Sequence, residues 1–219
     1  MSTNFKRSIR ASHEKFRVAL TNVETQPVIA EKMAEMGYTS DVLQEGSVYL
    51  ANSLAADYRS KIERDEMKAA YRIFNGKCLT LKGIYSRLRK ISKVAFRNDP
   101  NAATKLSLDS AEPGNYLLWV EAARKFFTEI SGNPEYLEKL SVLQVSEEEI
   151  NEGLKLIKEM EEARAVYVKE KGQSQVATEE KKAAFRKIDD WMSDFYAVAQ
   201  IAFMDNPQYQ EVLGKVVKS

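Results

Sequence analysis

The chain has 219 residues, of which 44% are hydrophobic and 30% are charged, with only 9 glycines and 5 prolines. This composition is typical of an ordered globular protein rich in helix-forming residues, and it excludes a largely disordered chain. The sequence contains no run of about 20 apolar residues, and its first ten residues lack the apolar segment of a signal peptide. We therefore expect a cytoplasmic protein without a transmembrane helix.

The net charge of +1 conceals two oppositely charged halves. Residues 1–110 hold 19 Lys and Arg against 12 Asp and Glu, whereas residues 111–219 hold 14 Lys and Arg against 20 Asp and Glu. Such an asymmetry indicates binding to a partner of opposite charge, which includes another copy of the chain.

The first half contains a recurring order of helix signals. Apolar positions from Ile9 to Val23, spaced three and four residues apart, predict a long helix. Pro27 is typical of the first turn of a short helix, and Gly37 is typical of a left-handed helix end. Two more long helices are expected before residue 95, with a turn between them at residues 64–66 or 75–76. Asp99-Pro100 then begins a further short helix.

The second half repeats this order when it is shifted by 107 positions, without a gap. Pro27 falls on Pro134, and Glu45-Gly46 falls on Glu152-Gly153. Ser146 and Glu149 form a capping box at the start of a long helix. That helix is expected to end at residues 171–173, before the next one starts near Thr178. Asn206-Pro207 begins the last short helix.

Strand signals are missing from both halves. We predict an all-α protein, an antiparallel helical bundle of about six long helices with short helices that begin at prolines. The ungapped register predicts an internal duplication with pseudo-twofold symmetry, made of repeats 1–110 and 111–219. The two repeats are expected to form a single domain of residues 1–219, with two closely packed subdomains as the alternative.

The usual catalytic and metal-binding motifs are missing from the sequence. A single histidine, His13, excludes a di-iron carboxylate bundle, and a single cysteine, Cys78, excludes an internal disulfide or a Cys-x-x-Cys pair. We interpret His13, which lies on the apolar stripe of the first helix, and Cys78 as packed or boundary residues. No phosphate-binding loop, nucleophile elbow or EF-hand loop occurs. We therefore expect a non-catalytic protein with no cofactor and no metal site.

One segment is strongly basic. Between Met67 and Asn98 the sequence has nine basic residues and no acidic one, whereas the corresponding segment of the second half is mixed. The fold therefore does not impose this basic character. The candidate interaction residues, basic ones first and acidic ones after them, are Lys77, Lys82, Arg87, Arg89, Lys90, Lys93, Arg97, Glu147, Glu148, Glu159 and Glu162.

Three functions remain open. The first is a scaffold that binds another protein or self-associates, with the basic half of one copy on the acidic half of the next. The alternative is a nucleic-acid or anionic-surface binder that uses helix 68–97, which a pI of only 7.7 disfavours. The third is a bundle that binds a hydrophobic small ligand between aromatic side chains. These side chains are Tyr116, Trp119, Trp191, Phe195 and Tyr196. A further interpretation of the basic segment needs no partner: its charges are solvated or paired with acidic residues of the same chain.

Overall fold

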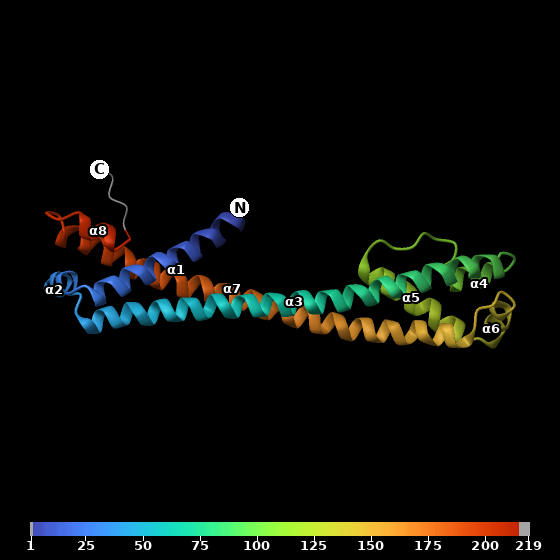
Figure 1. Cartoon of the computed structure of the whole chain (residues 1–219). Helices are drawn as coiled ribbons and strands as arrows, with labels where there is room; N and C mark the ends of the chain where they lie inside the picture. The colour runs from blue at the N-terminus through green and yellow to red at the C-terminus, as the bar shows by residue number, and fades with distance from the viewer. Residues whose placement is uncertain (1, 215–219) are drawn as a thin grey trace. The chain divides into compact units, whose positions relative to one another are not determined.

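A computed structural model describes residues 2–214, with side chains from residue 9 onward. Over this range the regular elements are all α-helices, which confirms the all-α prediction. In chain order (Figure 1) they are α1 (Ser2–Thr25), α2 (Pro27–Glu35), α3 (Ser40–Ala95), α4 (Pro100–Lys105), α5 (Tyr116–Ser131), α6 (Pro134–Ser141), α7 (Glu147–Ala202) and α8 (Gln208–Val212).

The helices α3 and α7 are each 56 residues long, so the turns predicted at residues 64–66 or 75–76 and at residues 171–173 are wrong. Within the described residues there are four helices of 16 residues or more instead of about six. Neither stretch contains a proline, and a single Gly172 inside a helix costs only about 1 kcal/mol. Tyr167 and Ser174, on either side of that glycine, are half-buried and buried, respectively.

A seven-residue spacing of inward positions keeps both long helices continuous. Along α3, residues seven positions apart stay buried or half-buried: Ser60, Met67, Phe74, Leu81, Leu88 and Ala95. The same holds along α7 for Met160, Tyr167, Ser174, Lys181, Ile188, Phe195 and Ala202. This spacing is typical of helices that pack lengthwise on a partner helix.

The chain divides into two compact units, and both long helices contribute to each of them. Unit 1 consists of Met1–Asp65 and Gly172–Ser219, and unit 2 consists of Glu66–Lys171. Unit 1 therefore holds α1, α2, α8, the first part of α3 and the last part of α7 (Figure 1). Unit 2 holds α4, α5, α6 and the remaining parts of α3 and α7. Each unit thus combines residues from both predicted repeats.

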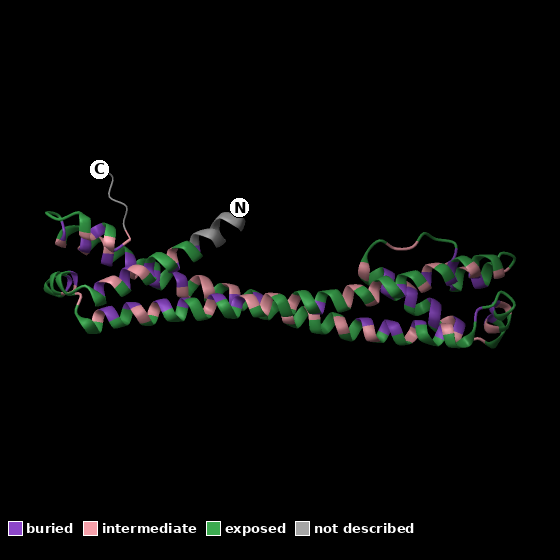
Figure 2. Cartoon of the chain, in the orientation of Figure 1, coloured by how far each residue is buried: buried purple, intermediate pink, exposed green. Residues whose placement is uncertain are grey.

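Each unit has its own hydrophobic core, drawn in purple in Figure 2. In unit 1, Phe16 and Leu20 of α1 belong to the same core cluster as Phe195 of α7. In unit 2, the fully buried Tyr85 of α3 packs edge-on against Phe126 of α5, with ring centroids 5.3 Å apart. Edge-to-face contacts between aromatic rings stabilise a core beyond the burial of their area.

The helix bounds recur at the predicted shift of 107 positions. Both ends of α3 coincide with those of α7, and α2 and α6 begin at the matching prolines. The shared glycines have a packing reason: a Cβ atom at Gly46 would overlap the ring of Trp191 in unit 1, and one at Gly153 would overlap the ring of Phe127 in unit 2. In both units a glycine therefore lets an aromatic ring lie directly on the backbone of a long helix. The common origin of the halves stays a prediction.

Candidate functional site

Two of the predicted basic residues are paired inside unit 2. The Lys77 Nζ atom lies 2.6 Å from the Glu159 Oε2 atom, and Arg87 forms an ion pair with Glu149. The Lys77 ammonium also lowers the pKa of Glu159. These pairs join the basic part of α3 to the acidic part of α7, so part of the predicted charge complementarity is satisfied within the chain.

Arg89 has a structural position that the sequence did not reveal. Its side chain is only 6% exposed and donates hydrogen bonds of 2.5 Å to the carbonyl oxygens of Ser107 and Ser110. Nearby, the Ser86 hydroxyl donates to the Glu112 carboxylate at 3.1 Å. These contacts fix the loop between α4 and α5 on the surface of α3, so Arg89 is not an available surface charge.

The other predicted basic residues, together with Arg72, form one exposed stripe along α3 and the turn that follows it. At 100° per residue, their positions fall within about 80° of one another around the helix and extend over roughly 38 Å along it. We call the following residues the basic stripe: Arg72, Lys82, Lys90, Lys93 and Arg97. All five are exposed, and none of them forms an ion pair with any residue that the structure describes.

Three of the four predicted acidic candidates remain exposed on α7. Glu147, Glu148 and Glu162 make no ion pair within the described part of the chain, whereas Glu159 is shared by Lys77 and Lys155. A hydrogen bond from the Ser146 side chain lowers the pKa of Glu148. We call the three exposed carboxylates the acidic face.

The opposite charges of the two halves do not produce two oppositely charged units. Unit 2 holds 18 Lys and Arg against 16 Asp and Glu, and unit 1 holds 15 against 16. Because each unit takes part of its residues from each half, the excess charges nearly cancel inside both. What remains is a local separation within unit 2, with basic residues on α3 and acidic residues on α7.

Unit 1 contains a buried polar network that composition alone did not predict. The His13 Nε2 atom and the Ser53 Oγ atom share a hydrogen bond of 2.8 Å. Close to them the Asp57 carboxylate contacts two ammonium groups, at 2.5 Å from Lys181 Nζ and 3.2 Å from Lys61 Nζ. His13, Ser53 and Asp57 are all less than 9% exposed, so the interpretation of His13 as a packed residue is confirmed.

The electrostatics of the network favour a neutral histidine beside an ionised aspartate. Burial lowers the pKa of His13, and the Lys181 charge lowers it further, against an opposing effect of Asp57. Burial tends to raise the pKa of Asp57, but Lys181 and Lys61 outweigh it and hold that pKa below its ordinary value. At the positions 107 residues after His13 and Ser53, unit 2 has the buried apolar residues Val120 and Met160. The fold itself therefore does not require this network.

Acidification is expected to destabilise unit 1 through His13. Because the folded state lowers the pKa of His13, the unfolded state binds a proton first as the pH falls below about 6.5. Stability is therefore full above that pH and decreases below it. Urea denaturation between pH 7.5 and pH 5 should show this loss in the wild-type chain and a smaller loss in His13→Val, which copies Val120. Equal pH dependence in both proteins would show that His13 does not control it.

The five aromatic candidates for a ligand site belong to different units. Trp191, Phe195 and Tyr196 lie in unit 1, where the Trp191 and Phe195 rings stack with centroids 5.6 Å apart and burial raises the pKa of Tyr196. Tyr116 and Trp119 lie in unit 2, where both line a cavity of about 340 Å³. The five predicted residues therefore do not line one site. Only Tyr116 and Trp119 border the cavity of unit 2.

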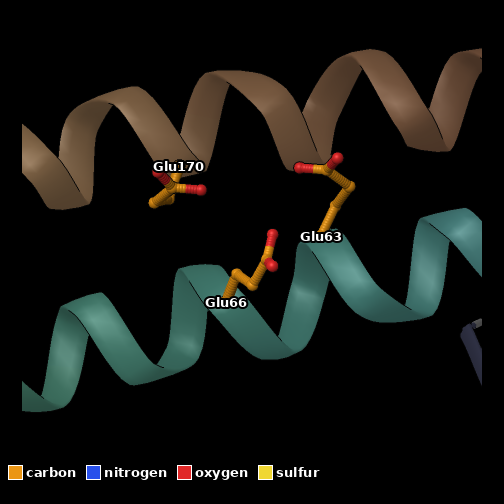
Figure 3. Close-up of side chains that lie close together, drawn as sticks. All are labelled: Glu63, Glu66 and Glu170. Atoms are coloured by element: carbon orange, nitrogen blue, oxygen red, sulfur yellow. The ribbon is translucent and has the colours of Figure 1, made fainter.

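Figure 3 shows three glutamates, Glu63 and Glu66 on α3 and Glu170 on α7. Glu63 belongs to unit 1, and the other two belong to unit 2. Glu63 has a basic neighbour on its own helix, Arg59 at 3.9 Å, and Glu170 has Lys169 at 3.5 Å. The Glu63 and Glu170 side chains are each 16% exposed, and Glu66 is exposed. A group of acidic side chains is not by itself a metal site, and we assign none to them.

Comparison with known proteins does not assign the chain to a family. No protein-family model, no curated protein and no solved structure matches the chain. Among the described residues, no helix combines the length and the apolar character needed to cross a membrane. The functional interpretation therefore rests on the geometry of the two units.

Proposed function

We propose that the chain is a non-catalytic helical scaffold that associates with copies of itself. In this proposal the basic stripe of one copy docks on the acidic face of the next. The observation that carries the proposal is the row of five exposed basic side chains along α3 and the turn after it, without ion-pair partners among the described residues.

The strength of such a contact depends on several charges acting together. A single exposed ion pair contributes only about 0–1 kcal/mol and is screened by salt. Because the acidic face has three carboxylates, up to three such pairs form with the stripe, and together they set the register of the two surfaces. We propose a head-to-tail contact, in which each copy uses its stripe on one neighbour and its acidic face on another, so that the assembly extends to a ring or a filament.

A second copy suits the stripe better than a nucleic acid does. Unit 2 carries 16 acidic residues beside its 18 basic ones, and those carboxylates repel phosphate groups. The same near-neutral balance lowers the long-range repulsion between copies of the chain and favours their association. The acidic face offers the opposite charge on the surface of the same unit.

The positions of His13 and Cys78, the histidine and the cysteine that could act as a general base or a nucleophile, support a role without catalysis. His13, the only histidine, is 6% exposed and hydrogen-bonded inside the core of unit 1. Burial raises the pKa of Cys78, the only cysteine, and so disfavours its reactive thiolate form.

The internal duplication belongs to the same proposal. The coincident bounds of α3 and α7 support it, as do the matching aromatic contacts of Gly46 and Gly153. In both units the beginning of one repeat packs with the end of the other. Fusion of two exchanged copies into one chain gives this arrangement, so we infer that the ancestral repeat was itself a self-associating chain.

Light scattering during a salt titration tests the self-association. At about 50 mM salt, the wild-type mass should exceed the 24.9 kDa of one chain, and it should fall to that value near 0.5 M salt because the Debye length shrinks. The variant Lys90→Gln/Lys93→Gln/Arg97→Gln should have the mass of one chain throughout.

The control Lys125→Gln/Lys158→Gln/Lys171→Gln removes the same charge from exposed residues of unit 2 outside the stripe, and it should still associate. A wild-type chain that stays monomeric at every salt concentration contradicts the proposal. Binding of mixed RNA or DNA in a gel shift that the stripe variant abolishes would favour the nucleic-acid alternative instead.

A further inference from the structure

Unit 2 contains a cavity of about 340 Å³ between α3, α5 and the loop that joins α4 to α5. Cys78 and Lys82 line it from α3, Glu112 lines it from the loop, and Tyr116 and Trp119 line it from α5. The volume is at the small end of the range for ligand sites, which suits a molecule of one or two rings.

The loop wall of this cavity is fixed in place. Arg89 holds the loop by the carbonyl oxygens of Ser107 and Ser110, and Glu112 accepts a hydrogen bond from Ser86. Because the wall is already ordered, a ligand that enters this cavity causes little loss of conformational entropy in the loop.

The cavity is a property of unit 2 and not of the repeated fold. At the position 107 residues after Cys78, unit 1 has Phe185, whose ring is buried against His13 with centroids 5.6 Å apart. At the position 107 residues before Trp119, unit 1 has Ser12, which has no ring. The small thiol side chain of Cys78 therefore leaves space where the matching position of unit 1 holds a ring.

The walls combine aromatic surface with a positive charge at the rim. The Tyr116 ring packs edge-on against Phe74 and carries the Arg164 guanidinium 4.7 Å from its centroid. Lys82 is exposed and forms no ion pair with a described residue, whereas Glu112 is already hydrogen-bonded to Ser86. The Glu112 carboxylate keeps its negative charge in that hydrogen bond, but Lys82 and the Arg164 guanidinium beside Tyr116 supply two positive charges against this one. The balance of charge around the cavity is therefore cationic and attracts an anionic group.

Trp119, which lines the same cavity, also carries a buried hydrogen-bond donor. Its side chain is 7% exposed, and its indole N–H has no acceptor among the described residues. Buried donors are rarely left unsatisfied, because the missing hydrogen bond destabilises the folded protein. A polar atom on a bound ligand would supply the acceptor after a small shift of the ring.

From these observations we propose that the cavity of unit 2 binds a small aromatic carboxylate. The ring lies against Tyr116 and Trp119, and the carboxylate lies at the Lys82 ammonium. This binding site goes beyond the proposed self-association. It involves no covalent step, so the ligand enters and leaves unchanged.

Protection of Cys78 from alkylation provides the first test, because it is the only cysteine of the chain. Naphthalene-2-carboxylate should slow the reaction of Cys78 with iodoacetamide in a saturable manner, at about 0.5 M salt where self-association is suppressed. In ¹⁵N-labelled protein the same titration should shift the indole N–H signal of Trp119 and leave that of Trp191 unchanged. Naphthalen-2-ylmethanol, which lacks the charge, should bind more weakly, and naphthalen-2-ylmethylamine should bind most weakly.

Three variants separate the site from adventitious binding. Lys82→Gln should lower the affinity for the carboxylate by about fivefold or more, because a charge-assisted contact is lost. The matched control Lys90→Gln, on the same helix outside the cavity, should change it by less than about twofold. Cys78→Phe, which copies Phe185, should fill the cavity and abolish binding in calorimetry.

Several results would overturn the assignment. They are unsaturable protection of Cys78, equal effects of Lys82→Gln and Lys90→Gln, or undiminished binding by a folded Cys78→Phe variant. A preference for the amine over the carboxylate would overturn the proposed ligand class. If Cys78→Phe does not fold, the comparison of the two lysine variants decides alone. Self-association is read separately from the mass at low salt, so the two proposals fail independently.

Discussion

Replacement of Asp57 by leucine should destabilise unit 1 by about 3 kcal/mol or more. The reason is the Lys181 ammonium, which lies 2.5 Å from the Asp57 carboxylate and belongs to a side chain that is only 12% exposed. Without Asp57, that charge stays in a poorly solvated position with no opposite charge. Urea denaturation of Asp57→Leu in a Trp119→Phe background measures the loss, because Trp191 then reports unit 1 alone.

The double variant Asp57→Leu/Lys181→Leu separates the ion pair from simple packing. Removing both charges eliminates the unpaired ammonium, so most of the lost stability should return. As an exposed control, Glu14→Gln breaks the pair between Glu14 and Arg17, whose side chains are 62% and 59% exposed, and should change stability far less than Asp57→Leu does. If Asp57→Leu is as stable as the wild type, the ion pair between Asp57 and Lys181 does not stabilise unit 1.

Cleavage of the chain between α4 and α5 should leave the two fragments bound to each other. A protease site at the exposed residues 109–111 divides the chain at the junction of the two predicted repeats. In unit 1, α1, α2 and the first part of α3 pack with α7 and α8, and in unit 2 the rest of α3 packs with α5, α6 and α7. Each fragment therefore contributes half of both cores, and separation would expose both cores to water.

Size-exclusion chromatography with light scattering at about 0.5 M salt measures this directly, because high salt suppresses contacts between charged surfaces. The cleaved protein should elute as one species with the mass of the intact chain. Two separate fragments, each folded, would mean that each half forms its own unit. That result would contradict both the exchanged packing and the fusion origin inferred from it.

Much of the fold could be predicted because helix ends are encoded locally. Asn133 accepts hydrogen bonds from the first turn of α6, and Asp99 accepts one from Ala102 in α4. The predicted capping box begins α7 with a hydrogen bond of 3.3 Å from the Glu149 N–H to the Ser146 hydroxyl. Gly37 takes the expected left-handed conformation, with φ at +93°. Each of these signals depends only on neighbouring residues.

The continuity of α3 and α7 could not be predicted from such local signals. Asn75-Gly76 and Gly172 are turn residues in isolation, and their helical conformation depends on packing that extends beyond them. The spacing of seven residues from Ser60 through Met67 to Phe74 was the available signal. It was hard to recognise because Ser60, and Ser53 seven positions before it, are polar residues at inward positions.

The charged site was predictable only in part, because its partners come from the other half of the chain. The sequence indicated that the segment around Lys77 and Arg87 is basic, but not that α7 lies beside it in the same unit. Once the two helices are adjacent, Glu159 and Glu149 pair with these residues. Arg89 was misjudged for a related reason, since its hydrogen bonds go to backbone carbonyls of a loop without a sequence signature.

Mixing two charge-reversed variants tests the proposed self-association most directly. One variant is Lys90→Glu/Lys93→Glu/Arg97→Glu on the basic stripe, and the other is Glu147→Lys/Glu148→Lys/Glu162→Lys on the acidic face. Each variant alone should have the 24.9 kDa mass of a single chain at about 50 mM salt, because its two docking surfaces carry like charges. Their equimolar mixture should regain the larger wild-type mass. A mixture that stays monomeric while the wild-type chain associates would contradict the docking of the stripe on the acidic face.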